Sequence, residues 1–392
     1  MYSNTPDLIW ERISAQDAMP AGRQGSASGG QKGVFIIAEA GKNFIQTEEE
    51  RPIEEYLKNA FELVDKASWA GADAIKFQTH NVEDEQLNLE IVSPHFKGAD
   101  RYRWVTRNTN ATPVNEFWKP LKEYCDKKGI IFFSTPMSRG AAMRLSEVGT
   151  PLWKIGSGDI LDFVTMDYMR NTDLPIIMSS GMSMFEEVER GIRFLKAKSK
   201  RVALMHCLSK YPGLPEEANL ATMELFREKF PGIPIGFSEN SIGIEPSLIA
   251  VAHGATIIEK HFTIRRDLWG SDHKVSSTPE EFKHLALSIR KIEADVNERE
   301  RWLNYPNIKA VLGRKEKILR DDEAVFRPIF RKSLMAGRDI KVGEVLDPGM
   351  VYAMRPQLYA KGLSSENYES VIGKKIKQDL KKYSPIDHSV LV

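Results

Sequence analysis

Residues able to bind anions or transfer protons stand at the ends of short apolar runs in this sequence. One run closes on Glu259, Lys260 and His261, and two others carry Lys76 and Lys154. Further groups of this kind follow other runs, at Glu39 and Asn43, Gln78, Ser134 and Thr135, Ser157 and Asp159, Ser179 and Ser180, His206, Ser209 and Tyr211, and Ser238, Glu239 and Asn240. Burying an unpaired ammonium group is unfavourable unless an anion compensates it. The two lysines therefore predict a site for a phosphate or a carboxylate.

Each of these residues also has a structural interpretation. A single lysine at a strand end is more often part of an ion pair or reaches solvent. Two lysines with hydroxyl neighbours on adjacent strands favour anion binding instead. His261 alone fits a core histidine as well as a ligand, whereas His206 beside Cys207 fits core packing.

The apolar runs predict the architecture that would bring these side chains together. Amphipathic segments such as MFEEVERGIRFLKAKS, with a period near 3.6, separate the runs and indicate helices. Eight alternating strand and helix units favour a closed (β/α)8 TIM barrel, an α/β fold whose strand ends meet at one mouth. An open doubly wound sheet is the alternative. The eight runs cover residues 35–41, 73–78, 130–136, 152–158, 175–180, 202–207, 234–239 and 255–262.

Composition divides the chain into four predicted parts. Residues 1–33 include AMPAGRQGSASGGQKG, which has little to bury, so this segment is expected to be flexible. The barrel is expected over 34–298 and a charged linker over 299–325. Short β-type runs broken by Gly, Asp and Pro predict a small β-rich domain over 326–392.

Overall charge and cysteine content exclude several classes of protein. Lys and Arg number 55 against 54 Asp and Glu, so nucleic acid and membrane surfaces are not expected as partners. Cys125 and Cys207 lie far apart, which argues against a disulfide framework or a zinc site. No membrane span or signal-peptide pattern is present. We expect a cytoplasmic protein.

Nine motifs, in order and at the spacing of barrel units, resemble the sialic acid synthase (N-acetylneuraminate synthase) family. They read FIIAEAGKN, GADAIKFQ, FFSTP, KIGSGD, PIIMSSGMS, HCLSKYP, GFSENSIG, GATIIEKHF and GSDHK. FRKSLMAGRDIKVGEVL followed by MRP resembles the small antifreeze-like C-terminal domain of that family. The resemblance spans roughly residues 34–385 and implies a TIM barrel followed by an antifreeze-like domain.

The resemblance implies a reaction and its substrates. Phosphoenolpyruvate would condense with the open-chain aldehyde of an N-acetylated amino sugar, N-acetylmannosamine or a 6-deoxy-diacetamido hexose, and phosphate would leave by cleavage of a carbon–oxygen bond. The residues implied to hold phosphoenolpyruvate are Lys76, Thr135, Lys154, Ser157, Ser179, Ser209, Tyr211 and Ser238. Glu39, Gln78 and Asp272 would contact the sugar, with Asp272 near the aldehyde.

Two further roles follow from the resemblance. Asp159 stands where the family has a glutamate suspected of proton transfer, which implies general acid–base work beside Glu39 and Asp272. Arg355 matches an arginine that the small domain contributes to the active site of the partner subunit. The resemblance therefore implies a domain-swapped homodimer.

The resemblance also implies a divalent ion, usually Mn²⁺ or Mg²⁺, that polarises the aldehyde oxygen. His261 matches one ligand, but Asn240 stands where the family usually has a second histidine. An amide oxygen suits a hard ion better than a transition metal. Glu239, one carbon longer than the usual aspartate, is a further candidate ligand. Phe44 and Ser209 also depart from residues that are common in the family.

Three hypotheses for the function remain open at this point. The first is a nonulosonic acid synthase. The second, suggested by Asn240, is a catalytically weakened paralogue that binds a sugar or phosphoenolpyruvate. The third is a related barrel enzyme that condenses phosphoenolpyruvate with a sugar phosphate, and the appended small domain argues against it.

Overall fold

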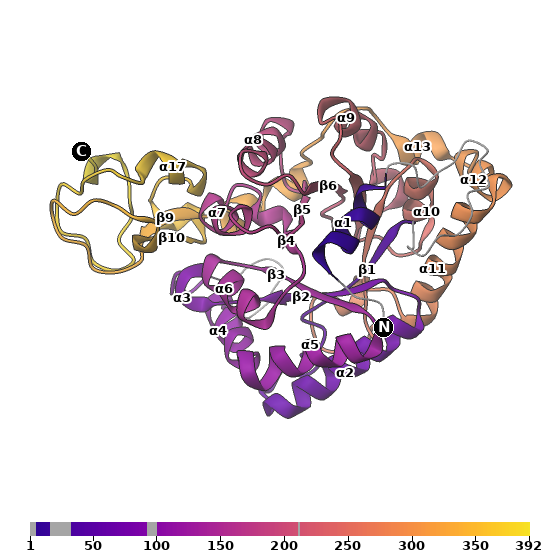
Figure 1. Cartoon of the computed structure of the whole chain (residues 1–392), viewed down its shortest axis with the longest axis horizontal. Coiled ribbons are helices and arrows are strands. Elements are labelled where there is room, and N and C mark those ends of the chain that lie inside the picture. The colour runs from indigo at the N-terminus through magenta and orange to yellow at the C-terminus, as the bar shows by residue number, and fades with distance from the viewer. Residues whose placement is uncertain (1–4, 16–32, 92–99, 211) are drawn as a thin grey trace.

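A barrel of eight parallel strands surrounded by helices forms the centre of the computed structural model, which describes residues 5–15, 33–91, 100–210 and 212–392 (Figure 1). The hydrogen-bonded order is β3-β2-β1-β8-β7-β6-β5-β4, and β3 also lies against β4, which brings the two ends of the sheet together. The predicted TIM barrel is confirmed. Its strands are β1 Phe35–Gly41, β2 Ala74–Thr79, β3 Ile131–Pro136, β4 Trp153–Ile155, β5 Ile176–Ser179, β6 Val202–Cys207, β7 Ile235–Glu239 and β8 Ile257–His261.

Strand β1 illustrates why the strands read as continuous apolar runs. All seven of its residues are buried. Phe35 and Ile37 belong to the cluster inside the barrel, while Ile36 and Ala38 pack with the helices outside it. Because successive side chains of a strand point to opposite faces, a strand buried on both faces needs apolar residues at nearly every position.

The surrounding helices begin and end at residues suited to those positions. Helix α6 starts after Ser138, whose hydroxyl accepts a hydrogen bond from the Ala141 amide, and it ends at Gly149, which has a φ of 81°. Helix α7 begins after Asp162, whose carboxylate caps the Thr165 amide. The larger helices are α2 Ile53–Trp69, α4 Arg101–Ala111, α5 Lys119–Lys128, α6 Arg139–Val148, α7 Phe163–Arg170, α8 Phe185–Lys196, α9 Ala221–Lys229, α10 Glu245–Ala252 and α11 Pro279–Ala294.

A helix also precedes the barrel. Helix α1, Pro6–Ser14, buries Ile9 and Ile13 in the same interior cluster as Phe35, and an ion pair of 2.6 Å joins Arg12 to Asp73. The helix covers the end of the barrel where the strands begin. This part of the chain differs from the flexible segment expected over residues 1–33, and residues 16–32 lie outside the described residues.

The expected linker forms several short helices. Helix α12, Val296–Leu303, crosses the boundary expected at residue 298 and packs against α10 and α11. It is followed by α13 Ile308–Leu312, α14 Asp321–Ala324 and α15 Arg327–Phe330. The last two helices run beside the mouth of the barrel, so this segment takes part in building the site.

The C-terminal domain contains the antiparallel pair β9, Ser333–Ala336, and β10, Val351–Met354. It stands beside the barrel next to α3, α6 and α7 (Figure 1). Helix α3, Val82–Glu85, joins the two parts, because the Arg355 amide donates to the Glu85 carbonyl at 2.8 Å. Among the described helices, none is long and apolar enough to cross a membrane, and both cysteines are buried free thiols.

Candidate active site

A pocket opens where the barrel strands end, and two buried lysines lie at its floor. Lys76 comes from β2 and Lys154 from β4, and the carboxylate of Glu259 on β8 lies between them, 3.7 Å and 3.6 Å from their ammonium groups. Burial alone would raise the pKa of Glu259, but the two cations lower it below its usual value. The floor therefore combines two positive charges with a carboxylate that balances part of them while the pocket is empty.

Hydroxyl groups from three alternate strands, β3, β5 and β7, complete this floor. Thr135 accepts a hydrogen bond from the Lys76 ammonium at 3.0 Å, and Ser179 accepts one from Lys154 at 2.7 Å. Ser238 donates to Glu259 at 3.2 Å. The structure thus brings together five of the residues predicted to hold phosphoenolpyruvate.

A second group of hydroxyls lies against Gly181. Ser157 and Ser209 both line the pocket, and a Cβ added to Gly181 would overlap with their hydroxyl oxygens. The glycine therefore lets two hydroxyls approach the backbone closely, an arrangement suited to phosphate oxygens. Tyr211, predicted to join this group, lies outside the described residues.

The predicted sugar-binding residues form one wall above the lysines. Gln78 donates a hydrogen bond to Glu39 at 3.0 Å, and the other carboxylate oxygen of Glu39 lies 2.6 Å from the Lys76 ammonium. An ideal Cβ on Gly41 would lie 3.3 Å from Glu39, 3.4 Å from Gln78 and 3.6 Å from Asp272. These three side chains, drawn from three separate segments, therefore converge on one glycine.

Asp159 and Arg355 lie at the outer edge of the pocket. Arg355 contacts Asp159 at 2.5 Å, and Lys332 contacts the same carboxylate oxygen at 3.0 Å. Burial would raise the pKa of Asp159, but these two cations lower it. An ionised, doubly paired carboxylate suits anchoring of Arg355 better than the acid–base work predicted for it, which stays a prediction.

Arg355 lies at the mouth of the barrel of its own chain. The sequence led us to expect this arginine in the active site of a partner subunit. The difference has a local cause, because helix α3 after β2 pairs with the segment around Arg355 and holds the small domain beside its own barrel.

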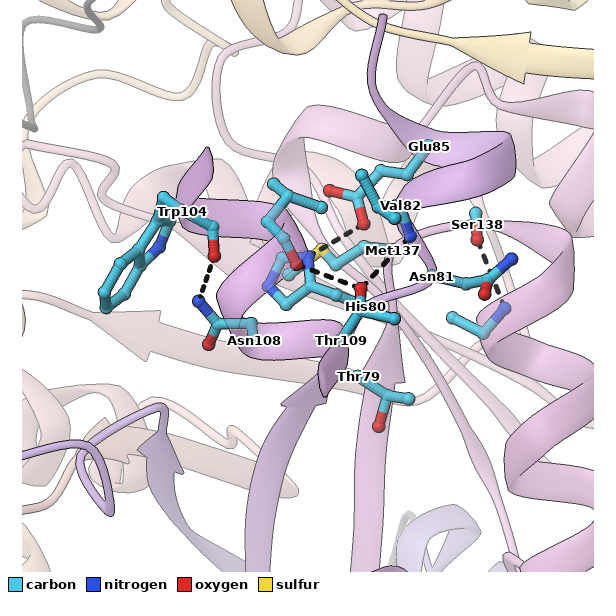
Figure 2. Close-up of polar contacts among 12 residues, drawn as sticks. Thr79, His80, Asn81, Val82, Glu85, Trp104, Asn108, Thr109, Met137 and Ser138 are labelled. Atoms are coloured by element: carbon cyan, nitrogen blue, oxygen red, sulfur yellow. Dashed lines mark hydrogen bonds and ion pairs between the residues drawn. The ribbon is translucent and has the colours of Figure 1, made fainter. Parts of the chain in front are cut away.

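Several residues that the sequence analysis did not select also line the rim. His80, just after β2, hydrogen-bonds Glu85 of α3 at 2.8 Å (Figure 2). Arg101 of α4 lies 4.8 Å from the ring centre of Phe330, which belongs to the segment expected to start the small domain. Arg331 donates to the Met182 carbonyl at 3.0 Å and thereby ties the small domain to the loop after β5. Arg101, Phe330 and Arg331 lie outside the strand-end pattern, because they come from α4 and from the start of the small domain. His80 directly follows β2 and could have been found from that position.

The metal ligands predicted from the resemblance do not form a convincing metal site. His261 and Asn240 both line the pocket, but the Asn240 amide nitrogen donates to the Leu208 carbonyl at 2.6 Å, so this side chain can offer one oxygen. Glu239 does not reach the pocket, because its carboxylate binds Lys260, at 3.0 Å, and the hydroxyls of Ser241 and Ser247. The expectation that Glu239 serves as a ligand is therefore wrong.

The donor set is too small for a resident divalent ion. Among the described residues there is no group of three or more His, Cys, Asp and Glu side chains placed to hold a metal. Catalytic zinc sites usually have three protein ligands, and Mg²⁺ is usually bound through one or two carboxylates. One imidazole and one amide oxygen do not fit that requirement.

Comparison with known families agrees with the fold. The model of the NeuB family matches residues 63–301, and that of the SAF domain matches residues 331–391. The chain belongs to the NeuB family. The NeuB match includes every strand end that lines the pocket except that of β1, and the SAF match includes Arg355.

Similar NeuB-family proteins are aligned over most of their length. The N,N'-diacetyllegionaminic acid synthase of Campylobacter jejuni is 32% identical, over 88% of this chain and 96% of its own. The crystal structure of the spore coat polysaccharide biosynthesis protein SpsE of Bacillus subtilis is 30% identical, with a TM-score of 0.74 over 93% of this chain and 96% of that one. The N-acetylneuraminic acid synthetase of Leptospira borgpetersenii is 32% identical, with a TM-score of 0.56 over 78% of this chain and 94% of that one.

Proposed function

We propose that the chain condenses phosphoenolpyruvate with the open-chain aldehyde of an N-acetylated amino sugar, forming a nonulosonic acid and releasing phosphate. The observation that carries the proposal is that one pocket contains two adjacent sites, an anion site and a polar site. Lys76 and Lys154, with their hydroxyl partners, suit the two anionic groups of phosphoenolpyruvate, and the wall of Glu39, Gln78 and Asp272 suits a polyhydroxylated partner above it. The Campylobacter and Leptospira relatives, named as a diacetyllegionaminic acid synthase and an N-acetylneuraminic acid synthetase, support the same reaction class.

The residues of the chain have distinct tasks in this reaction. The two lysines hold the phosphate and carboxylate groups and fix the orientation of the nucleophilic carbon toward the aldehyde. Glu39 contacts both Lys76 and Gln78, so it lies where the two substrates meet and can accept a proton from the water that attacks C2. Asp272 orients the aldehyde end of the sugar. Its pKa, which burial would raise, is lowered chiefly by Lys42, so it remains a carboxylate.

The finer features of the proposal concern cofactor, assembly and location. A cytoplasmic location stays a prediction. Dependence on Mn²⁺ or Mg²⁺ is what the family resemblance implies, but the residues described above do not fit such an ion, and no step above uses a metal. The domain-swapped homodimer implied by the resemblance also stays a prediction, with Arg355 as the residue that would be exchanged. N-acetylmannosamine and a 6-deoxy-diacetamido hexose are the proposed sugars.

A second function follows from Asn240. Because its amide group is engaged by the Leu208 carbonyl, the position differs in chemistry from an imidazole ligand. A paralogue that binds phosphoenolpyruvate or sugar with little turnover is therefore the competing proposal. It predicts that phosphoenolpyruvate raises the melting temperature without release of phosphate.

The deciding experiment measures phosphate release from phosphoenolpyruvate with a panel of 2-acetamido hexoses and their 6-deoxy derivatives. Each sugar is tested with Mn²⁺, with Mg²⁺ and with a chelator. Release with one sugar, lost in Lys154→Ala and kept in the exposed-lysine control Lys196→Ala, would support the synthase. Full activity of Lys154→Ala would contradict the assigned floor, and binding without release across the panel would favour the weakened paralogue.

A further inference from the structure

Lys42 lines the upper pocket from a backbone position that is held on both sides. Strand β1 changes register with β2 between Glu39 and Gly41, and Gly41 has a φ of +53°, which a larger residue adopts with difficulty. The chain then turns, with the Asn43 amide donating to the Ala40 carbonyl at 2.8 Å. The side chain of Asn43 donates to the Phe262 carbonyl, also at 2.8 Å. Lys42 therefore projects from a fixed turn over the mouth.

The charged groups around Lys42 are those of the sugar wall and the rim. Burial lowers the pKa of the Lys42 ammonium group, and the charge of Arg101 of α4 lowers it further. Asp272 from the loop after β8 attracts the ammonium group most strongly, and Glu85 of α3 and Glu39 of β1 add to that attraction, so these carboxylates offset part of the lowering. The ammonium nitrogen also lies 5.6 Å from the ring centre of Trp104. Lys42 thus places a positive charge beside the carboxylate predicted to lie near the substrate aldehyde.

This arrangement meets a chemical need that the poor metal site leaves open. Attack on an aldehyde places negative charge on its oxygen, and a fixed cation or hydrogen-bond donor stabilises that charge. One imidazole and an amide group that already bonds the Leu208 carbonyl form a poor ligand set for a divalent ion, whereas the Lys42 ammonium group lines the same pocket. We propose that Lys42 takes the place of the divalent ion and activates the aldehyde of the sugar. The inference rests on the proposed condensation and names the group that makes the aldehyde electrophilic.

The proposed step balances in atoms and electrons. The double bond of phosphoenolpyruvate supplies the pair for the new carbon–carbon bond, and the carbonyl π pair moves to the aldehyde oxygen. That oxygen takes a proton from the Lys42 ammonium group, which is protonated again from solvent. Water adds at C2 and loses one proton to Glu39. The C2–O bond to phosphate then breaks, and the remaining hydroxyl proton passes to the departing phosphate as the ketone forms.

The test compares the wild-type protein with Lys42→Met and Lys42→Arg in chelator-treated buffer, using the sugar that gives phosphate release. We expect the wild type to keep its activity with the chelator. Lys42→Met should lose about 100-fold or more in kcat, the usual cost of removing one donor from a developing oxyanion. Lys42→Arg keeps a charged donor and should retain more activity than Lys42→Met.

Two controls separate this role from damage to the site. Lys274→Met removes an exposed lysine from the loop that carries Asp272, and its kcat should stay within about twofold of wild type. Lys42→Met should still gain as much thermal stability from phosphoenolpyruvate as wild type, because Lys76 and Lys154 are untouched.

An Mn²⁺ titration by calorimetry should show no tight site in the wild type and tighter binding in Asn240→His.

Three outcomes would overturn the role of Lys42 and leave the condensation intact. They are wild-type activity that disappears with chelator and returns with Mn²⁺ or Mg²⁺, normal kcat in Lys42→Met, and a sugar adduct on Lys42 after borohydride reduction, which would show an imine. Absence of phosphate release by the wild type with every sugar and ion would instead contradict the proposed function itself.

Discussion

Glu259 is a single residue that balances the charges of the two floor lysines in the absence of substrate. Its carboxylate lies within 3.7 Å of both floor lysines, so it stabilises their charges when no substrate is bound. The anionic groups of phosphoenolpyruvate would stabilise part of the positive charge of the two lysines in its place. Glu259 is therefore a residue whose contribution to stability should depend on the ligand.

Glu259→Gln tests this dependence. We expect the free energy of unfolding of the empty protein to fall by about 3 kcal/mol, because removing one partner of a buried ion pair leaves the other uncompensated. Phosphoenolpyruvate should then raise the melting temperature more in the variant than in wild type. Scanning fluorimetry with and without phosphoenolpyruvate measures both effects, with the exposed Glu224→Gln as control. Equal ligand-induced shifts in all three proteins would refute the idea.

His206 gives a prediction about pH. Burial, with a smaller contribution from the charge of Lys317, lowers the pKa of His206 to about 3, and its Nε2 bonds the Ala218 carbonyl at 2.7 Å. A histidine in the unfolded chain titrates near 6.5, so below that pH the unfolded state binds a proton that the folded state does not. This residue alone should make the free energy of unfolding fall by about 1.4 kcal/mol per pH unit between about pH 6 and pH 4.

His206→Gln keeps an amide donor for the Ala218 carbonyl and removes the titrating group. Urea unfolding at several pH values should therefore show a shallower loss of stability below pH 6 than in wild type. His284→Gln, at an exposed position of α11, serves as the control and should keep the wild-type slope. An unchanged slope in His206→Gln would mean that the histidine is already protonated in the folded protein.

At the residue scale, strand position decided which site residues could be predicted. Lys76 and Lys154 were found because a lysine within an apolar strand is unusual. Glu239 was misjudged because neighbouring residues at a strand end point in opposite directions, and sequence alone does not show which of them faces the pocket. Lys42 was not selected because it follows a register shift in β1, which the alternation pattern does not reveal.

At the scale of elements, the eight strands and their helices could be predicted because their apolar patterns repeat with clear periods. Helix α1 could not be predicted, because it is short and stands beside a Gly- and Ser-rich stretch that dominates the composition of residues 1–33. Its packing depends on a distant partner, the interior of the barrel, where Ile9 and Ile13 are buried. The short helices of the linker escaped prediction for the same reason, since contacts with the mouth stabilise them.

Replacing Ile13 measures what α1 contributes. Ile13 is fully buried and Leu8 on the same helix is 46% exposed. Ile13→Ala should lower the free energy of unfolding by about 2–5 kcal/mol, as for other buried Ile-to-Ala changes, because a cavity remains in the interior cluster. Leu8→Ala should change it by less than about 0.5 kcal/mol. Urea unfolding measures both, and similar values for the two variants would show that α1 does not pack as described.

At the scale of the whole molecule, the position of Arg355 relates the site to assembly. In this structure the arginine completes the pocket of its own chain, whereas the family resemblance implies exchange between subunits. Sequence motifs identify the arginine but not the barrel that it serves, because both arrangements use the same contacts. Only the path of the connecting segment distinguishes them.

Mixing Arg355→Ala chains with Lys154→Ala chains, after joint unfolding and refolding, separates the two arrangements. If each arginine serves its own barrel, every site in a mixed dimer lacks one residue, and phosphate release would stay at the level of the separate variants. In a swapped dimer one site would regain both residues. The proposed swapped homodimer therefore predicts recovered activity, and no recovery would count against the exchange.

Helix α1 covers one end of the barrel, and in the described part of the chain the pocket opens at the other. The phosphoenolpyruvate floor lies beneath the sugar wall, so the two substrates share one route with different depths. Because the deeper site is reached only past the sugar wall, we expect an ordered mechanism. Phosphoenolpyruvate binds first, and the sugar acid dissociates before phosphate. Excess sugar should then inhibit by closing the route to the floor, and phosphate should compete with phosphoenolpyruvate alone.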